Sequence, residues 1–233
     1  MKMTTSYLFL IALSITGLCA GSQHETNSFL DRIAAFYVKK PVEWMALDPV
    51  HLPWTNFSVK HTSLPGKNVT VVMDHGILHG LSGALQRVGD CRLHQKNNQN
   101  VTVTCNATLD GLRANFRASV QHDQLPLTTA GADYLVGLSK EERSEMEFTV
   151  KDSRALFQIT AIPWSRCSLK VFSVSSMDTE VTLNREPTLE EGMKSKFFEE
   201  ARSRVAEMIK DVLQSHFKDA LDKASRGAYM RMD

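Results

Sequence analysis

The C-terminal part of the chain carries one helical pattern that is much longer than the helices of ordinary globular proteins. No proline or glycine interrupts the sequence between Lys194 and Arg226, and Thr188 and Glu191 have the spacing of a capping box at its start. The apolar stripe comprises Met193, Phe197, Ala201, Val205, Met208, Ile209, Val212, Leu213, Phe217 and Leu221. A helix of roughly 30 residues would be about 45 Å long. An apolar surface of similar length therefore has to cover this stripe.

The middle of the chain alternates between apolar and polar residues with the period of a β-strand. Between Asn100 and Leu109, the odd positions hold Val, Cys, Ala and Leu, and the even positions hold Asn and Thr. Similar alternation predicts further strands at 112–120, 146–150 and 155–161, and a weaker one at 169–173. The short or polar connections between these segments are those of antiparallel neighbours.

A shorter helical pattern precedes the strands. Apolar residues share one face at Phe29, Leu30, Ile33, Ala34 and Tyr37. Asn27 or Ser28 is available as a cap, and Pro41 is expected to end the helix. The proline-rich segment 41–54 predicts an irregular connection rather than a second helix.

The order of these elements predicts the fold class. Helix, strands and long helix follow one another without the βαβ alternation of parallel sheets. We therefore expect an α+β fold, in which a curved antiparallel sheet wraps around the long C-terminal helix and an N-terminal helix completes the molecule.

The first twenty residues have the layout of a signal peptide. A lysine at position 2 precedes an apolar run from about Tyr7 to Leu18, and small residues follow. The run is too short for a membrane span of about 20 residues, and no later stretch supplies one. We expect cleavage after residue 20 and a secreted, extracellular protein in which residues 21–233 form a single domain.

Asn-x-Ser/Thr sequons occur four times after the signal peptide. The acceptor asparagines would be Asn56, Asn68, Asn100 and Asn106. Behind a signal peptide, these sequons predict surface glycosylation.

Three cysteines remain once Cys19 is removed with the signal peptide. Cys91 and Cys105 are symmetric about Asn98, so a hairpin that folds there would bring them together as a disulfide. Such a bridge would contribute about 3 kcal/mol in the chain-entropy model. Cys167 is left over: it is a buried thiol, a reactive thiol or the bridge of a dimer.

Motifs for chemistry are weak. His75 and His79 would share a helix face, but three nearby glycines disfavour a helix there and no HExxH glutamate is present, so we predict no metal site. The segment Gly80–Ala84 departs from the nucleophile elbow of hydrolases, because Ala84 stands where that motif has its last glycine. We therefore do not expect Ser82 to be the nucleophile of an esterase. We expect no enzymatic activity and no cofactor. The formal net charge of +1 and the scattered basic residues also argue against a nucleic-acid partner.

The segment from His79 to Asp90 resembles a motif of the mite group 7 allergens, which are secreted single-domain proteins of the tubular lipid-binding superfamily. The matching residues are Gly80, Leu81, Arg87, Val88, Gly89 and Asp90. The resemblance implies a long sheet around a terminal helix, enclosing an elongated apolar groove for a lipid or similar ligand. Takeout-like carriers are a related alternative within this superfamily. The predicted disulfide, the third cysteine and the four sequons are departures from the family.

Our leading hypothesis is a carrier that sequesters a lipid or another apolar small molecule without chemistry. The residues expected to line the groove are Phe116, Phe148, Phe157, Ile159, Val205, Met208, Val212 and Phe217. The same residues would equally make a dry core, and the sequence does not separate the two. The second hypothesis is a secreted protein that acts on another protein through its outer surface.

Overall fold

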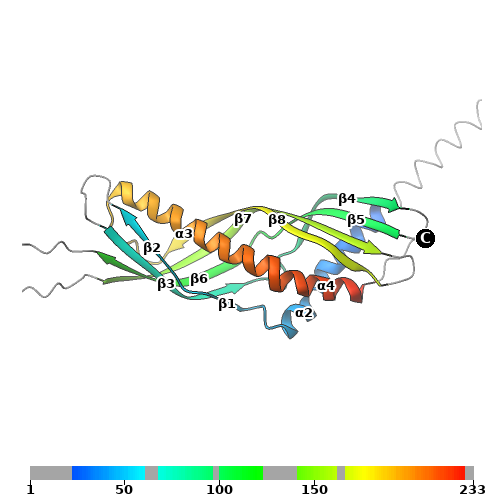
Figure 1. Ribbon diagram of the computed structural model, residues 1–233, viewed down its shortest axis with the longest axis horizontal. Coiled ribbons are helices and arrows are strands. Elements are labelled where there is room, and N and C mark those ends of the chain that lie inside the picture. The colour runs from blue at the N-terminus through cyan, green and yellow to red at the C-terminus, as the bar shows by residue number, and fades with distance from the viewer. Residues whose placement is uncertain (1–22, 61–67, 97–99, 123–140, 162–165, 229–233) are drawn as a thin grey trace, which may run out of the picture.

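The C-terminal pattern forms one long helical rod that runs along an eight-stranded sheet (Figure 1). The computed structural model describes residues 23–60, 68–96, 100–122, 141–161 and 166–228. The rod comprises α3 (Glu191–Val212), the π-helical turn η2 (Leu213–Phe217) and α4 (Lys218–Gly227). The expected fold class, a curved antiparallel sheet with a long C-terminal helix and an N-terminal helix, is confirmed.

Every pairing within the sheet is antiparallel. The strands are β1 (Val50–Leu52), β2 (Thr55–Lys60), β3 (Asn68–His79), β4 (Gln86–Lys96), β5 (Asn100–Thr108), β6 (Arg113–His122), β7 (Glu141–Ala161) and β8 (Ser168–Leu183). In one half of the sheet the order is β2-β3-β6-β7-β8, and in the other half it is β4-β5-β7-β8. The long strands β7 and β8 therefore join the two halves.

The two strands predicted at 146–150 and 155–161 are one strand, so that prediction was wrong. β5 and β6 lie end to end along the same edge of β7, where Ala107 pairs with Ala155 and Arg113 pairs with Thr149. On its other edge β7 pairs with β8 through both halves, with register shifts around Arg154. The apolar alternation of β7 is interrupted where its pairing with β8 is irregular, and the strand continues beyond this point.

A polar cluster fastens β7 where β5 ends and β6 begins. Asp110 Oδ1 accepts hydrogen bonds from the Ser153 backbone nitrogen at 2.8 Å and from its hydroxyl at 2.5 Å. Ser153 Oγ in turn accepts the Leu109 backbone N–H at 2.7 Å and lies 2.9 Å from Thr108 Oγ1. Burial disfavours the charge on Asp110, but the hydrogen bonds from Ser153 and Thr108 outweigh it and lower the pKa of this carboxyl.

The helices close the curved sheet on its apolar side. α3 contacts both β2 and β8, the two edge strands of one half, and α4 contacts β8 in the other half. At its other edge, that second half is covered by the N-terminal helix, which is joined to β4 by hydrogen bonds. The apolar faces of both halves are thereby covered by helices (Figure 1).

The N-terminal helical region is longer than predicted. Residues 23–32 are α-helical and continue into η1 (Ile33–Tyr37) and α2 (Lys39–Trp44). Pro41 does not end the helix, because it lies in the first turn of α2, where a missing N–H costs nothing. The prediction of an irregular connection at 41–54 is thus wrong in two places, because residues 41–44 are helical and residues 50–52 form β1.

Three finer predictions also fail. Asn27 and Ser28 are inside the helix and do not cap it. At α3, the N-cap is Glu190 without a side-chain cap bond, while the Thr188 backbone N–H donates to Glu142, so no capping box forms. In the first part of β8, where the weak strand was predicted, the buried residues are Phe172 and Val174 rather than the predicted odd positions, because register shifts change the phase of this strand.

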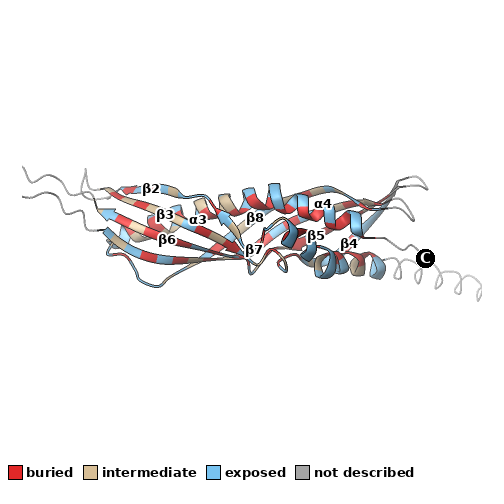
Figure 2. Cartoon of the chain, turned by 90° about the horizontal axis from the view of Figure 1, so that it is seen from below, coloured by how far each residue is buried: buried red, intermediate tan, exposed pale blue. Residues whose placement is uncertain are grey.

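The alternation of burial elsewhere follows the sequence closely (Figure 2). In β5 every odd position from Val101 to Ala107 is buried, and the even positions from Thr102 are at least partly exposed. The apolar face of the strands and the stripe of the terminal rod meet in one hydrophobic cluster. This cluster extends through both halves of the molecule.

Candidate functional site

The residues predicted to line a groove come together in the interior. Phe116 lies on β6, three of the others lie on β7, and four lie on the terminal rod. Seven of the eight are buried members of the hydrophobic cluster, and Met208 is partly buried and packs against it. The sequence pattern therefore places these side chains between sheet and helix, as the carrier hypothesis requires.

Aromatic rings pack at three places along this interior. Phe116 and Phe148 meet edge to face with ring centroids 5.9 Å apart. Phe172 of β8 and Phe217 of η2 make a second edge-to-face pair at 5.9 Å. Phe57 of β2 meets Phe197 of α3 at 6.0 Å. Such pairs contribute about 0.5–1.5 kcal/mol beyond the area that they bury.

Three of these rings were missed as candidate lining residues. Phe197 stood in the helical stripe and was a visible candidate. Phe57 lies on β2, within a segment whose strand pattern the sequence analysis did not identify. Phe172 was assigned to the outer face by the wrong phase of β8. The strand pairing reveals that Phe57 and Phe172 belong to this interior, and Phe197 packs against Phe57 there.

The interior is filled by its own side chains in this structure. Phe148, Val205 and Phe217 are completely enclosed, and Phe116, Phe157 and Ile159 nearly so. Within the described part of the chain, side chains so tightly surrounded leave no ligand-sized space directly beside them. A ligand would have to separate the terminal rod from the sheet or displace some of these side chains.

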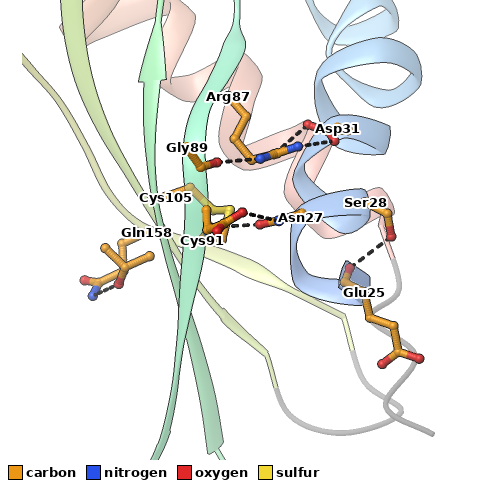
Figure 3. The surroundings of a disulfide bond; sticks show 11 residues. Glu25, Asn27, Ser28, Asp31, Arg87, Gly89, Cys91, Cys105 and Gln158 are labelled. Atoms are coloured by element: carbon orange, nitrogen blue, oxygen red, sulfur yellow. Dashed lines mark hydrogen bonds and ion pairs between the residues drawn. A yellow bond between two sulfur atoms is a disulfide. The ribbon is translucent and has the colours of Figure 1, made fainter. Parts of the chain in front are cut away.

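The segment that carries the family motif fastens the N-terminal helix to β4 (Figure 3). Arg87 makes a two-pronged contact with Asp31, with Nε to Oδ1 at 3.0 Å and Nη2 to Oδ2 at 2.9 Å. Arg87 also donates to the Gly89 carbonyl. The hydrogen bond to Asp31 is the main reason why the pKa of Arg87 is raised. Arg87 and Gly89 thus have a structural role here.

Asn27 makes the second link between the N-terminal helix and β4. Its side-chain nitrogen donates to Asp90 Oδ1 at 2.8 Å, and its oxygen accepts the Cys91 backbone N–H at 2.8 Å. The backbone of β4 is free to reach this amide because the pairing of β4 with β5 is irregular between Val88 and Arg92. Asn27 and Asp90 are 63 positions apart, so no local pattern could predict the contact.

The disulfide lies at the same place. Cys91 and Cys105 are joined with an S–S distance of 2.01 Å, and the flanking pairs Arg92–Thr104 and Leu93–Val103 have the register that symmetry about Asn98 predicts. Cys167 lies apart from this bridge and is 1% exposed. A thiol so enclosed would have to be uncovered before it could bridge to a second chain, and the dimer stays a prediction.

Ser82 is held by Asp48, which lies on the connection between α2 and β1. Asp48 Oδ2 accepts the Ser82 hydroxyl at 2.6 Å and its backbone N–H at 2.9 Å, and Asp48 Oδ1 accepts the Gly80 backbone N–H at 2.8 Å. Partial burial disfavours the charge on Asp48, but these hydrogen bonds outweigh it and lower the pKa of the carboxyl. The arrangement anchors a turn and bonds the serine hydroxyl directly to the Asp48 carboxylate.

The two histidines considered as metal ligands lie on a strand. Both His75 and His79 belong to β3, and His75 Nδ1 lies 2.6 Å from Asp74 Oδ1 and contacts Arg117. Within the described ranges, no group of three or more His, Cys, Asp or Glu side chains is placed to hold a metal ion.

Three of the four sequon asparagines have described side chains. Asn56 and Asn106 are exposed and Asn68 is partly exposed, while the side chain of Asn100 lies outside the described residues. Asn106 faces outward from the middle of the sheet, paired with Val88 of β4 on one side and Leu156 of β7 on the other. These three residues line a hollow of about 680 Å³ on the outer face.

We expect a glycan on Asn106 to cover its two apolar neighbours, since Val88 is 50% and Leu156 37% exposed. Asn106→Gln should remove one glycan from the intact mass of the protein expressed in a glycosylating host and increase its binding of an apolar dye. Asn56→Gln, on an edge strand, is the matched control and should leave dye binding unchanged. Equal dye binding by both variants would contradict this role for the Asn106 glycan.

Two sequence comparisons relate different lengths of this chain to known proteins. A sequence model of the family described as Group 7 allergen matches residues 25–131, which confirms the resemblance to this family. The Salivary anticoagulant protein P23 of Ixodes scapularis is 20% identical over 229 residues, covering 95% of this chain and 96% of that protein. No helix within the described residues is both long and apolar enough to cross a membrane.

Two solved structures show a distant likeness. Lipopolysaccharide binding protein matches with a TM-score of 0.36 and 12% identity over 82% of this chain, and the match spans 40% of that longer protein. Takeout 1 of Epiphyas postvittana matches with a TM-score of 0.26 and 14% identity over 76% of this chain and 74% of its own.

Proposed function

We propose, from the resemblance of this chain to the group 7 allergens, that it is a secreted, glycosylated carrier without enzymatic activity. In this proposal residues 1–20 are removed as a signal peptide, and residues 21–233 act as one domain that binds a lipid or another apolar small molecule. The observation that carries the proposal is the continuous hydrophobic cluster between the sheet and the terminal rod.

Affinity would come from apolar area removed from water, at about 25 cal/mol per Å². The residues proposed to contact the ligand are Phe116, Phe148, Phe157, Ile159, Val205, Met208, Val212 and Phe217. Because the interior is closed, ligand uptake requires α3 to move away from one of the edge strands that it bridges, β2 or β8. Met208 is already partly exposed, and its flexible side chain suits a surface that must repack.

Native mass spectrometry of the secreted protein, before and after extraction with organic solvent, tests the carrier proposal. We expect an additional mass that extraction removes and that is identified as a lipid or similar molecule. A protein that is empty as secreted and binds no added fatty acid would contradict the proposal.

A pair of variants on α3 locates the ligand. Val205→Phe adds a ring inside the closed interior, whereas Arg202→Phe adds the same ring on the exposed side of the helix. Val205→Phe should lower ligand occupancy severalfold and Arg202→Phe should not, provided that circular dichroism shows both variants folded. Equal occupancy in the two folded variants would place the ligand outside the interior.

The second candidate function is action on another protein through the outer surface. Its support is the similarity, along nearly the whole chain, to a salivary protein named as an anticoagulant. A clotting-time assay with ligand-free protein distinguishes the two candidates. Prolonged clotting that is unchanged in Val205→Phe would favour a surface function, and clotting that depends on bound ligand would favour the carrier.

A further inference from the structure

The N-terminal helical region exposes large aromatic side chains on the face opposite the core. Phe36 is 70% exposed and Trp44 is 82% exposed. Both residues belong to the continuous helical run that includes η1 and α2. Exposed apolar side chains scattered singly need no explanation, but a set on one helix face indicates a binding surface.

The exposed residues are arranged at regular steps. Arg32, Phe36, Lys40 and Trp44 follow one another at intervals of four residues, and all four are exposed. Residues four apart on a helix are neighbours, and the wider π-turn of η1 reduces the sideways drift that a regular α-helix would add. We call this set the aromatic-cationic face.

The helix is held firmly with this face outward. Its other side buries Phe29, Ile33 and Val42 in the hydrophobic cluster. The Tyr37 ring packs close to Gly227 at the end of α4, and Lys223 of α4 lies 3.4 Å from the sulfur of Met45. In Figure 1, α2 lies at the outside of the molecule beside α4.

The helical stretch 32–44 that carries this face has three basic residues and one acidic residue, so its formal charge is positive. Lys39 and Lys40 are adjacent and exposed, and Arg32 lies on the same helical run. Of the acidic neighbours, Asp31 is engaged by Arg87, and Glu43 lies 3.9 Å from Lys39. Aromatic rings settle at the boundary between lipid chains and headgroups, and lysine and arginine attract anionic headgroups.

We propose that the aromatic-cationic face docks this protein on the surface of an anionic lipid bilayer, with Phe36 and Trp44 inserted at headgroup depth and Arg32, Lys39 and Lys40 against the lipid charges. The helix lies flat on the surface and does not cross it. The docking depends on the outside of the helix, so it is independent of whether the interior carries a ligand.

Flotation of the secreted protein with phosphatidylcholine vesicles, with and without phosphatidylserine, tests this proposal. We expect binding to the vesicles that contain phosphatidylserine, weakened by added salt because its charge component is screened. Phe36→Ala combined with Trp44→Ala should weaken binding by about tenfold or more. Lys39→Glu combined with Lys40→Glu should also weaken it by about tenfold.

Trp54 provides the matched control, because it is 68% exposed but lies on the connection between β1 and β2. The affinity of Trp54→Ala for the vesicles should stay within about twofold of the wild-type value. Trp44 and Trp54 are both exposed and differ mainly in that Trp44 lies on the helix face and Trp54 does not. Absence of binding to phosphatidylserine vesicles, or equal losses from Trp54→Ala and Trp44→Ala, would overturn the proposal. The proposal would also be overturned if the wild-type protein sediments as a dimer and the Phe36 and Trp44 substitutions convert it to a monomer. That result would identify this face as a contact between two copies of the chain.

Discussion

Replacing Phe148 with alanine is expected to lower the free energy of unfolding by about 3–5 kcal/mol. The Phe148 side chain is completely enclosed and packs edge to face against Phe116 with centroids 5.9 Å apart. It lies on the half of β7 that pairs with β6, where surrounding strands on both sides restrict relaxation into the cavity. Urea unfolding followed by circular dichroism measures the change.

The control for this substitution is Phe36→Ala, which removes the same ring from an exposed helix position. Its effect on the free energy of unfolding should stay within about 0.5 kcal/mol. Equal losses in the two variants would show that the burial pattern described for β7 is wrong. If Phe148→Ala is nearly neutral, the interior already contains space beside Phe148, and a resident ligand there becomes the natural explanation.

Removing the disulfide is expected to lower the free energy of unfolding by about 3 kcal/mol. The bridge closes a loop with a sequence separation of 14, and it also holds together the irregular stretch of β4 to which Asn27 binds. The variant with both Cys91→Ser and Cys105→Ser should therefore unfold at lower urea concentration. Hydrogen exchange should increase in the N-terminal helix, because one of its two links to β4 is loosened.

A reducing agent supplies the internal control for this prediction. Reduction should lower the stability of the wild-type protein toward that of the double variant and leave the double variant unchanged. If the reducing agent affects both proteins equally, the loss comes from Cys167 or another source. If it affects neither, Cys91 and Cys105 are not bridged in the purified protein.

Much of the candidate site was predictable because its signals are local. The spacing of Phe148, Phe157 and Ile159 predicted which face of the sheet is buried, and the helical stripe predicted the face of the rod that contains Val205. Period alone decides these orientations, since side chains alternate on a strand and repeat every 3.6 residues on a helix. The symmetry of Cys91 and Cys105 predicted their pairing for the same reason, because a hairpin has one register.

The misses share a different cause. The phase of Phe172 depends on register shifts that the partner strand β7 imposes on β8. The role of Asn27 depends on Asp90 and Cys91, which reach it only through the tertiary fold. Pro41 was taken as a helix end, although a proline in the first turn is compatible with a new helix. For Phe172 and Asn27 the deciding contact lies outside the window that a periodic pattern covers, whereas for Pro41 the local signal was misinterpreted.

The sequence by itself determined the kind of most elements, the buried face of most of those and the pairing of two cysteines. The tertiary structure decided that β5 and β6 share one edge of β7, that α3 bridges β2 and β8, and that the described core side chains between them enclose one another. The physical reason is that the period of each helix or strand alone sets which of its faces is buried. Whether the interior is filled depends instead on the summed volumes of side chains from strands and helices far apart in the chain.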